Sequence, residues 1–161
     1  MAANYEPPLI RAVLARNIVE CRRLIDAGEA NVNEDRDGDR WTALHWASSG
    51  GHLDIAELLV SSGADMTIAD YYGRTALHLA TSYGHLDIVR LLLTEGADIT
   101  IAANDGMTAL HRASLYGLLD VANCLRKWPC SMAIIALQEI DTYKYLDFSS
   151  IEDLWHYLGN Q

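Results

Sequence analysis

Three histidines recur at a fixed interval, and histidine is a common metal ligand and proton carrier near neutral pH. His45, His78 and His111 each close a Thr-Ala-Leu-His sequence, and the sequences lie 33 residues apart. A zinc ion holds its nitrogen ligands at about 2.0–2.1 Å, whereas stacked helices lie roughly 8–10 Å apart. Equivalent positions on stacked helices are therefore too distant to share one ion. We predict that these histidines, like His52 and His85, form hydrogen bonds within their turns, and that the chain holds no metal or cofactor.

An acidic loop raises the separate question of calcium. The run Asp35–Asp39 alternates acidic residues as a calcium-binding loop does. The twelfth position from Asp35 is Trp46, however, where an EF-hand needs a bidentate glutamate. We therefore expect a solvated acidic loop that can attract a basic partner.

Signatures of catalysis are missing from the chain. It has no glycine-rich phosphate loop, no Gly-x-Ser-x-Gly sequence and no His-Glu-x-x-His sequence. Asp147, Asp153 and His156 could be combined into an acid–base set, but no nucleophile signature lies near them. We interpret them as helix-terminal charges and as part of an exposed face, and we predict that the protein is not an enzyme.

Composition and charge narrow the class of partner. Acidic residues outnumber basic ones by 22 to 12, which gives a formal net charge of −10. Nucleic acids and anionic membranes require a basic track, and the basic residues here form nothing larger than pairs such as Arg22-Arg23. We therefore expect a protein partner with a basic surface, and neither nucleic acid nor membrane.

The remaining composition suggests where the protein resides. No apolar run approaches the roughly 20 residues that cross a bilayer, and the first residues lack a secretory signal. Cys21, Cys124 and Cys130 form no Cys-x-x-Cys pair, which favours small buried apolar side chains over disulfides. We expect a monomer in the cytoplasm or the nucleus.

The elements that carry these residues come from an internal repeat. Residues 37–69 and 70–102 are identical at 20 of 33 aligned positions. Within the second of these units, Thr75 is placed to cap a helix that ends near Gly84, and a second helix follows it and ends near Gly96. Helices of about ten residues are unstable alone in water. Stacking of neighbouring units is therefore predicted to stabilise them.

The period of 33, the Thr-x-Leu-His-x-Ala sequence and the Gly-His-Leu-Asp-Ile run together resemble ankyrin repeats. The resemblance covers roughly residues 5–128. We therefore expect an ankyrin repeat domain at residues 1–128. It implies an all-α solenoid of helix-turn-helix units with β-hairpin-like loops. The expected units are a degenerate N-terminal capping repeat at about 5–36, with a two-residue insertion in the loop Glu29–Trp41, and repeats at about 37–69, 70–102 and 103–128.

The tail at 129–161 departs from the repeat. Ser131 could cap a helix that runs to about Ile140, and Ser149–Glu152 resembles a capping box before a second helix. We predict a C-terminal helical hairpin that closes the stack. The alternative is a docking segment that recruits other machinery, such as a ubiquitin ligase.

Positions that vary within otherwise constant units mark the expected binding surface. In ankyrin repeats, the loop tips and the ends of the first helices line a concave face. Large or aromatic side chains occupy such positions here, and aromatic residues and arginine are enriched in binding hot spots. The candidates are Trp41, Tyr71, Tyr72, Arg74, Tyr83, Met107, Leu115 and Tyr116. We expect the four tyrosines to form a nearly continuous strip.

The resulting function is that of a non-enzymatic interaction module, acting as an adaptor, a scaffold or an inhibitor. Two narrower alternatives rest on analogy: a small ankyrin-type inhibitor of kinases, and an adaptor that works through its helical tail.

Overall fold

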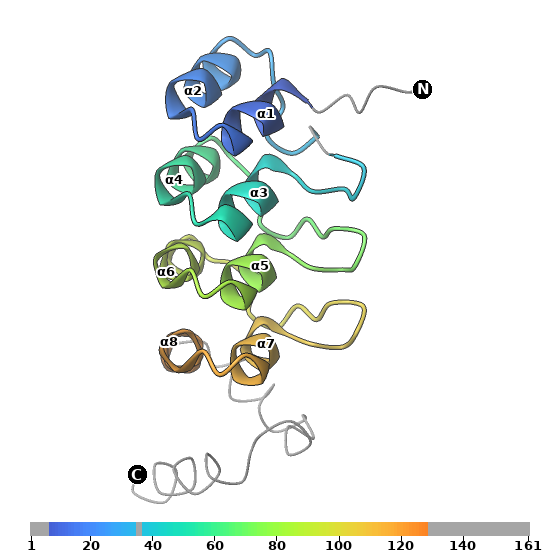
Figure 1. Ribbon diagram of the computed structural model, residues 1–161, viewed down its shortest axis with the longest axis vertical. Coiled ribbons are helices and arrows are strands. Elements are labelled where there is room, and N and C mark those ends of the chain that lie inside the picture. The colour runs from blue at the N-terminus through green and yellow to red at the C-terminus, as the bar shows by residue number, and fades with distance from the viewer. Residues whose placement is uncertain (1–6, 35–36, 129–161) are drawn as a thin grey trace, which may run out of the picture.

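Helix pairs stacked in one direction form the described part of the protein, as a computed structural model shows (Figure 1). The structure describes residues 7–34 and 37–128. The helices of the successive pairs are α1 (Pro8–Leu14) and α2 (Ile18–Asp26), α3 (Ala43–Gly50) and α4 (Leu53–Ser61), α5 (Ala76–Ser82) and α6 (Leu86–Thr94), and α7 (Ala109–Leu115) and α8 (Leu119–Lys127). The predicted helical solenoid is confirmed for this part of the chain, whereas the predicted tail hairpin lies outside it.

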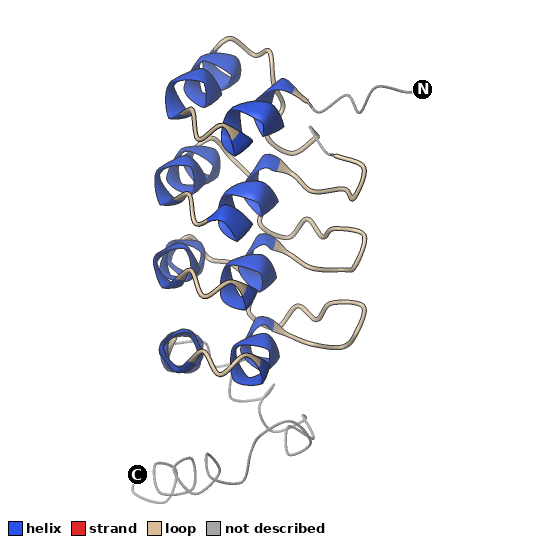
Figure 2. Ribbon diagram, viewed as in Figure 1, coloured by secondary structure: helices blue, strands red, loops and turns tan. Residues whose placement is uncertain are grey.

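Two layers of helices run along the stack. The first helices of the pairs pack against one another from α1 through α3 and α5 to α7, and α4 and α6 pack in the same way beside them. The loops before α3, α5 and α7 all project to the same side, away from the second helices (Figure 2). Side chains on these loops are therefore displayed together.

The core lies between units as well as within them. Leu44 and Leu77 occupy equivalent places in α3 and α5, and both are buried. Ile55 and Leu59 on α4 are fully buried in the same apolar cluster. Because helices of seven to nine residues have too few internal hydrogen bonds to persist alone, their stability depends on this shared core.

A histidine joins each inner unit to the next. His45 Nδ1 accepts a hydrogen bond from the Thr42 N–H at 3.2 Å, so the ring proton must sit on Nε2. His45 Nε2 then donates to the Arg74 carbonyl oxygen at 3.1 Å, in the loop of the following unit. His78 repeats the arrangement toward the Met107 carbonyl oxygen. These bonds confirm the predicted turn hydrogen bonds for His45 and His78, and they also reach across the unit boundary. The prediction is wrong for the other pair: His85 Nε2 bonds the Ser49 carbonyl oxygen of the preceding unit, and His52 Nδ1 is buried without a hydrogen-bond partner among the described residues.

The N-terminal end of the stack carries charged side chains. Glu20 and Arg23 on α2 stand where α4 has Ile55 and Leu58, which are buried. Arg23 forms ion pairs with Glu20 at 2.9 Å and with Glu29 at 3.0 Å. This end of the solenoid is thus adapted to water.

Truncation of a core leucine tests the dependence on stacking. Leu77→Ala should lower the free energy of unfolding by about 2–5 kcal/mol, because it removes buried methyl groups and leaves a cavity between units. Urea unfolding followed by circular dichroism would measure the change. Glu57→Ala, at an exposed position on α4, serves as the control, and equal stability of the two variants would contradict the shared core.

The histidines predict a pH dependence. Burial lowers the pKa of His78 to about 4, below the value of about 6.5 of an unfolded chain. The stabilisation by neutral His78 is complete above pH 6.5 and is lost as the pH falls toward 4, because the unfolded state binds the proton first. We expect the His78 contribution to the free energy of unfolding to fall by about 2 kcal/mol between pH 7.5 and pH 5. In His78→Gln the fall over this range should be smaller, and an identical fall would contradict the assignment.

Candidate protein-binding surface

Three loops, here called fingers, precede α3, α5 and α7 and comprise residues 37–42, 70–75 and 103–108. A backbone hydrogen bond closes each finger, such as that from the Asp70 N–H to the Arg74 carbonyl oxygen at 2.9 Å. Neighbouring fingers are also linked, because the Tyr71 N–H donates to the Asp39 carbonyl oxygen and the Asn104 N–H to the Tyr72 carbonyl oxygen. The fingers therefore form one hydrogen-bonded row rather than independent loops.

The turn of each finger requires a left-handed residue. Gly73 and Gly106 have φ values of 76° and 78°, and Arg40 adopts 65° at the equivalent place in the first finger. A Cβ on Gly73 would lie 2.7 Å from the Asn104 backbone nitrogen, so this turn also allows the third finger to approach closely.

Asp70 organises the first two fingers. Its Oδ1 accepts hydrogen bonds from the Tyr72 and Arg74 backbone N–H groups, both at 2.8 Å. Its Oδ2 lies 2.7 Å from Arg74 Nη2 and accepts a hydrogen bond from Trp41 Nε1 at 3.1 Å. One buried carboxylate thus fixes the turn of its own finger, the arginine that follows and a tryptophan from the preceding finger.

Arg74 lies between two aromatic rings. Its Cζ lies 5.6 Å from the Trp41 ring centroid and 4.9 Å from that of Tyr72, both within cation–π range. The ring of Trp46 supports Trp41 at a centroid distance of 4.6 Å, and Tyr71 meets Tyr72 edge-on at 5.6 Å. We call Trp41, Tyr71, Tyr72 and Arg74 the finger platform, and four of the predicted site residues are thereby brought together.

Charge on the fingers is unevenly compensated. Burial raises the pKa of Asp70, but the hydrogen bonds and the charge of Arg74 outweigh that effect and hold the pKa below its ordinary value. Asp70 and Arg74 therefore neutralise each other. Asp37 accepts hydrogen bonds from the Trp41 N–H and Trp46 Nε1, yet the described residues offer neither Asp37 nor Asp39 an ion pair. The row of fingers thus retains negative charge.

A second group of predicted residues lies at the opposite ends of the first helices. Tyr83, Leu115 and Tyr116 are exposed at the turns that lead into α6 and α8. Tyr83 stacks on His85, whose Nε2 hydrogen-bonds the Ser49 carbonyl oxygen of the preceding unit at 3.0 Å. We call Tyr83, Leu115 and Tyr116 the helix-turn group.

The two groups are separated by a helix length. The seven residues of α5 span about 10 Å, and no ring contact among the described residues connects the finger platform with the helix-turn group. Among the described residues, Tyr71 and Tyr72 contact each other, whereas no ring contact joins them to Tyr83 or joins Tyr83 to Tyr116. The predicted tyrosines thus form no continuous chain of ring contacts.

Met107 occupies in the third finger the place that Arg74 occupies in the second. Its carbonyl oxygen accepts the hydrogen bond from His78 Nε2, and its side chain is half-buried in the third finger. In the same finger, Asp105 pairs with Arg112 of α7 at 2.8 Å. Sequence analysis did not identify Asp70 or Arg112 as part of this surface. For Asp70, a signal was available in the sequence, because the equivalent residue of the preceding unit, Asp37, is also an aspartate.

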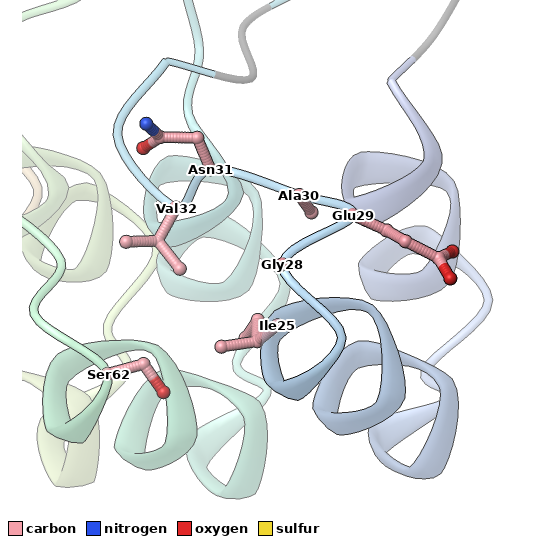
Figure 3. Close-up of a pocket in the computed structure, with 7 residues that line it drawn as sticks. All are labelled: Ile25, Gly28, Glu29, Ala30, Asn31, Val32 and Ser62. Carbon is pink, nitrogen blue, oxygen red and sulfur yellow. The ribbon is translucent and has the colours of Figure 1, made fainter.

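The described residues offer neither a metal-binding cluster nor a membrane-spanning helix. No group of three or more metal-ligating side chains is found within residues 7–34 and 37–128. In the same residues, every helix is too short or too polar to traverse a bilayer. A shallow hollow of about 350 Å³ lies between the end of α2, the loop after it and Ser62 at the end of α4 (Figure 3). Its carboxylate, Glu29, is paired with Arg23, so the hollow offers no acid–base pair.

Removal of the Asp70 carboxylate should loosen the finger platform. Asp70→Ala leaves Arg74 and Trp41 Nε1 without their acceptor, and we expect a loss of about 1–3 kcal/mol in the free energy of unfolding. Near-ultraviolet circular dichroism should also report looser packing of Trp41. Asp39→Ala, which removes an exposed carboxylate from the same row, is the control. Equal effects of the two substitutions would be inconsistent with a specific role for Asp70.

Known proteins share segments of this sequence. A mouse protein phosphatase 1 regulatory subunit 27 is 47% identical over 62 residues, which are 38% of this chain and 39% of that protein. A rice (Oryza sativa subsp. japonica) probable E3 ubiquitin-protein ligase, XBOS33, is 37% identical over 67 residues, 42% of this chain and 13% of the relative. A mouse 2-5A-dependent ribonuclease is 45% identical over 58 residues, 35% of this chain and 8% of the relative.

These relatives differ in their named activities, and the matched segments span well under half of each. The family model described as ankyrin repeats in three copies, by contrast, matches residues 2–70 and 67–134, most of the chain. Repeats of this family form protein–protein interaction modules. The chain belongs to the ankyrin repeat family.

Proposed function

We propose that this chain is a non-enzymatic adaptor, scaffold or inhibitor that binds another protein through the finger platform and the helix-turn group. The observation that supports this most directly is the exposure of aromatic side chains on a fixed support. Tyr71 and Tyr72 are 67% and 55% exposed, while their backbones are bonded to the fingers on either side.

Rigidity is what makes such a surface suitable for binding. A side chain that is ordered only on binding loses conformational entropy, on the order of 0.5–1.5 kcal/mol. Trp41 and Arg74 are already held by Asp70 and by ring contacts before any partner arrives. The platform therefore presents arginine and aromatic groups, which dominate binding energies at interfaces, at a reduced entropic cost.

The charge of the repeats favours a basic partner. Residues 37–102 contain nine acidic and three basic residues, a formal net charge of 3 − 9 = −6. One of those three bases, Arg74, is engaged by Asp70. A partner with lysine and arginine around an apolar contact would gain in association rate from this field.

Narrower roles are supported only by analogy. One relative is named as a regulatory subunit and another as a probable ubiquitin ligase, which suits an inhibitor or a recruiting adaptor. We propose a monomer that acts in the cytoplasm or the nucleus. The chain supplies the docking surface in either role, and the partner supplies the chemistry.

Partner capture with matched variants tests the proposal. The intact protein, a Tyr71→Ala/Tyr72→Ala variant and a Val19→Ala control would be used to recover proteins from a cell extract. Val19 is an apolar residue that is even more exposed, at 76%, but it lies on α2 away from the fingers. Circular dichroism would first establish that all three are folded.

We expect specific proteins to be recovered by the intact protein and the control but to be lost from the double variant. Binding should also weaken between roughly 50 and 300 mM salt, because surface charge is screened over shorter distances. Recovery of the same proteins by the double variant would exclude the finger platform as the binding site.

A further inference from the structure

The last unit exposes residues that the inner units bury. Leu110 on α7 is half-buried, whereas its counterparts Leu44 and Leu77 are buried. Leu119 on α8 is 71% exposed, whereas its counterparts in α4 and α6 are half-buried against the core. The difference follows one face, the side of the α7–α8 pair that corresponds to the contact between successive units. We call Leu110, His111 and Leu119 the end face.

His111 on the end face likewise lacks a contact that its counterparts make in the inner units. His111 Nδ1 accepts a hydrogen bond from the Thr108 N–H at 3.0 Å, so its proton also sits on Nε2. In the inner units this proton is donated to a carbonyl oxygen 29 residues further along the chain, as with His45 and Arg74. Among the described residues, His111 Nε2 has no such acceptor.

The two ends of the stack are therefore unlike. At the N-terminal end, charged residues of α2 replace the apolar residues that would contact a preceding unit, and Glu20 and Arg23 pair there. The end face keeps the apolar and hydrogen-bonding groups of an inner unit. Exposed apolar surface of this kind is typical of a site that another element covers, since a solvent-facing repeat needs a polar outer face.

We propose that residues 129–161 of this chain cover the end face and supply the acceptor for His111 Nε2. The segment begins directly after Trp128, which follows α8. It contains 33 residues, as many as one repeat, and its apolar residues fall at helical spacing in two groups, Ile134, Ile135, Leu137 and Ile140, and Ile151, Leu154, Trp155 and Leu158. Position 140 is also 29 residues beyond His111, the separation found in the inner units.

This inference concerns a surface separate from the finger platform, so it stands independently of the proposed function. It has a consequence for the tail nonetheless. Apolar side chains that cover the end face are engaged within the molecule, and they are then not free to recruit other machinery.

A pair of alanine substitutions in the intact protein provides the test. Leu119 and Val19 both lie in the first turn of a second helix and are similarly exposed in the described residues. Alanine favours helix more than either side chain, so substitution of an uncovered residue should leave the unfolding midpoint unchanged or slightly higher. If the tail covers Leu119, then Leu119→Ala should lower the midpoint by about 5–15 °C, whereas Val19→Ala should not.

A second variant separates the tail from other occupants. With the eight apolar tail residues replaced by serine, Leu119→Ala should no longer lower the midpoint, because its cover is already removed. An unchanged midpoint for Leu119→Ala in the intact sequence would overturn the proposal. So would an undiminished effect in the serine variant, and so would a dimer in sedimentation that dissociates on Leu119→Ala, since a second copy would then be the cover.

Discussion

The hydrogen bonds of one histidine per repeat connect the helices to the surface that they display. Because Nδ1 accepts from the threonine N–H at the start of its own helix, Nε2 must carry the proton. That proton is donated to a finger of the next unit, from His45 to the Arg74 carbonyl oxygen and from His78 to the Met107 carbonyl oxygen. The start of one helix and the position of the next finger are therefore set together, and both depend on a neutral, buried ring.

The order of the fingers follows from this coupling. The second and third fingers are each bound at the base to the histidine of the preceding unit. Near their tips, neighbouring fingers are bound to each other, as Tyr71 is to Asp39. Loops are usually the most mobile part of a fold, but here the loop backbone forms part of the network that stacks the units. An aromatic side chain on such a loop can be exposed and yet fixed, which is the property that a preformed binding surface requires.

The sequence was sufficient for the elements that depend on local rules. The threonine caps, the 33-residue period and the apolar spacing predicted the helices and their stacking, because each requirement recurs in the three units that begin at residue 37. The role of Asp70 was not predicted, since its bonds to Trp41 and Arg74 depend on how two fingers approach. The separation of Tyr72 from Tyr83 was also missed, because it depends on the length and direction of a helix rather than on residue type.

Comparing the repeats does not cleanly separate the residues that maintain the fold from those that form the surface. Asp37 and Asp70 match each other, although the third unit has Ala103 there, and such matching suggests a scaffold role. Trp41 and Arg74, which differ at equivalent positions, are assigned to binding by the same comparison. Yet the Asp70 carboxylate accepts from the tryptophan of the preceding finger and pairs with the arginine of its own. A substitution of Trp41 in one repeat thus changes the hydrogen bonds that the Asp70 carboxylate of the next repeat accepts. Side chains of neighbouring fingers are for this reason coupled, and the proposed binding surface is built from a pair of fingers rather than from a single repeat.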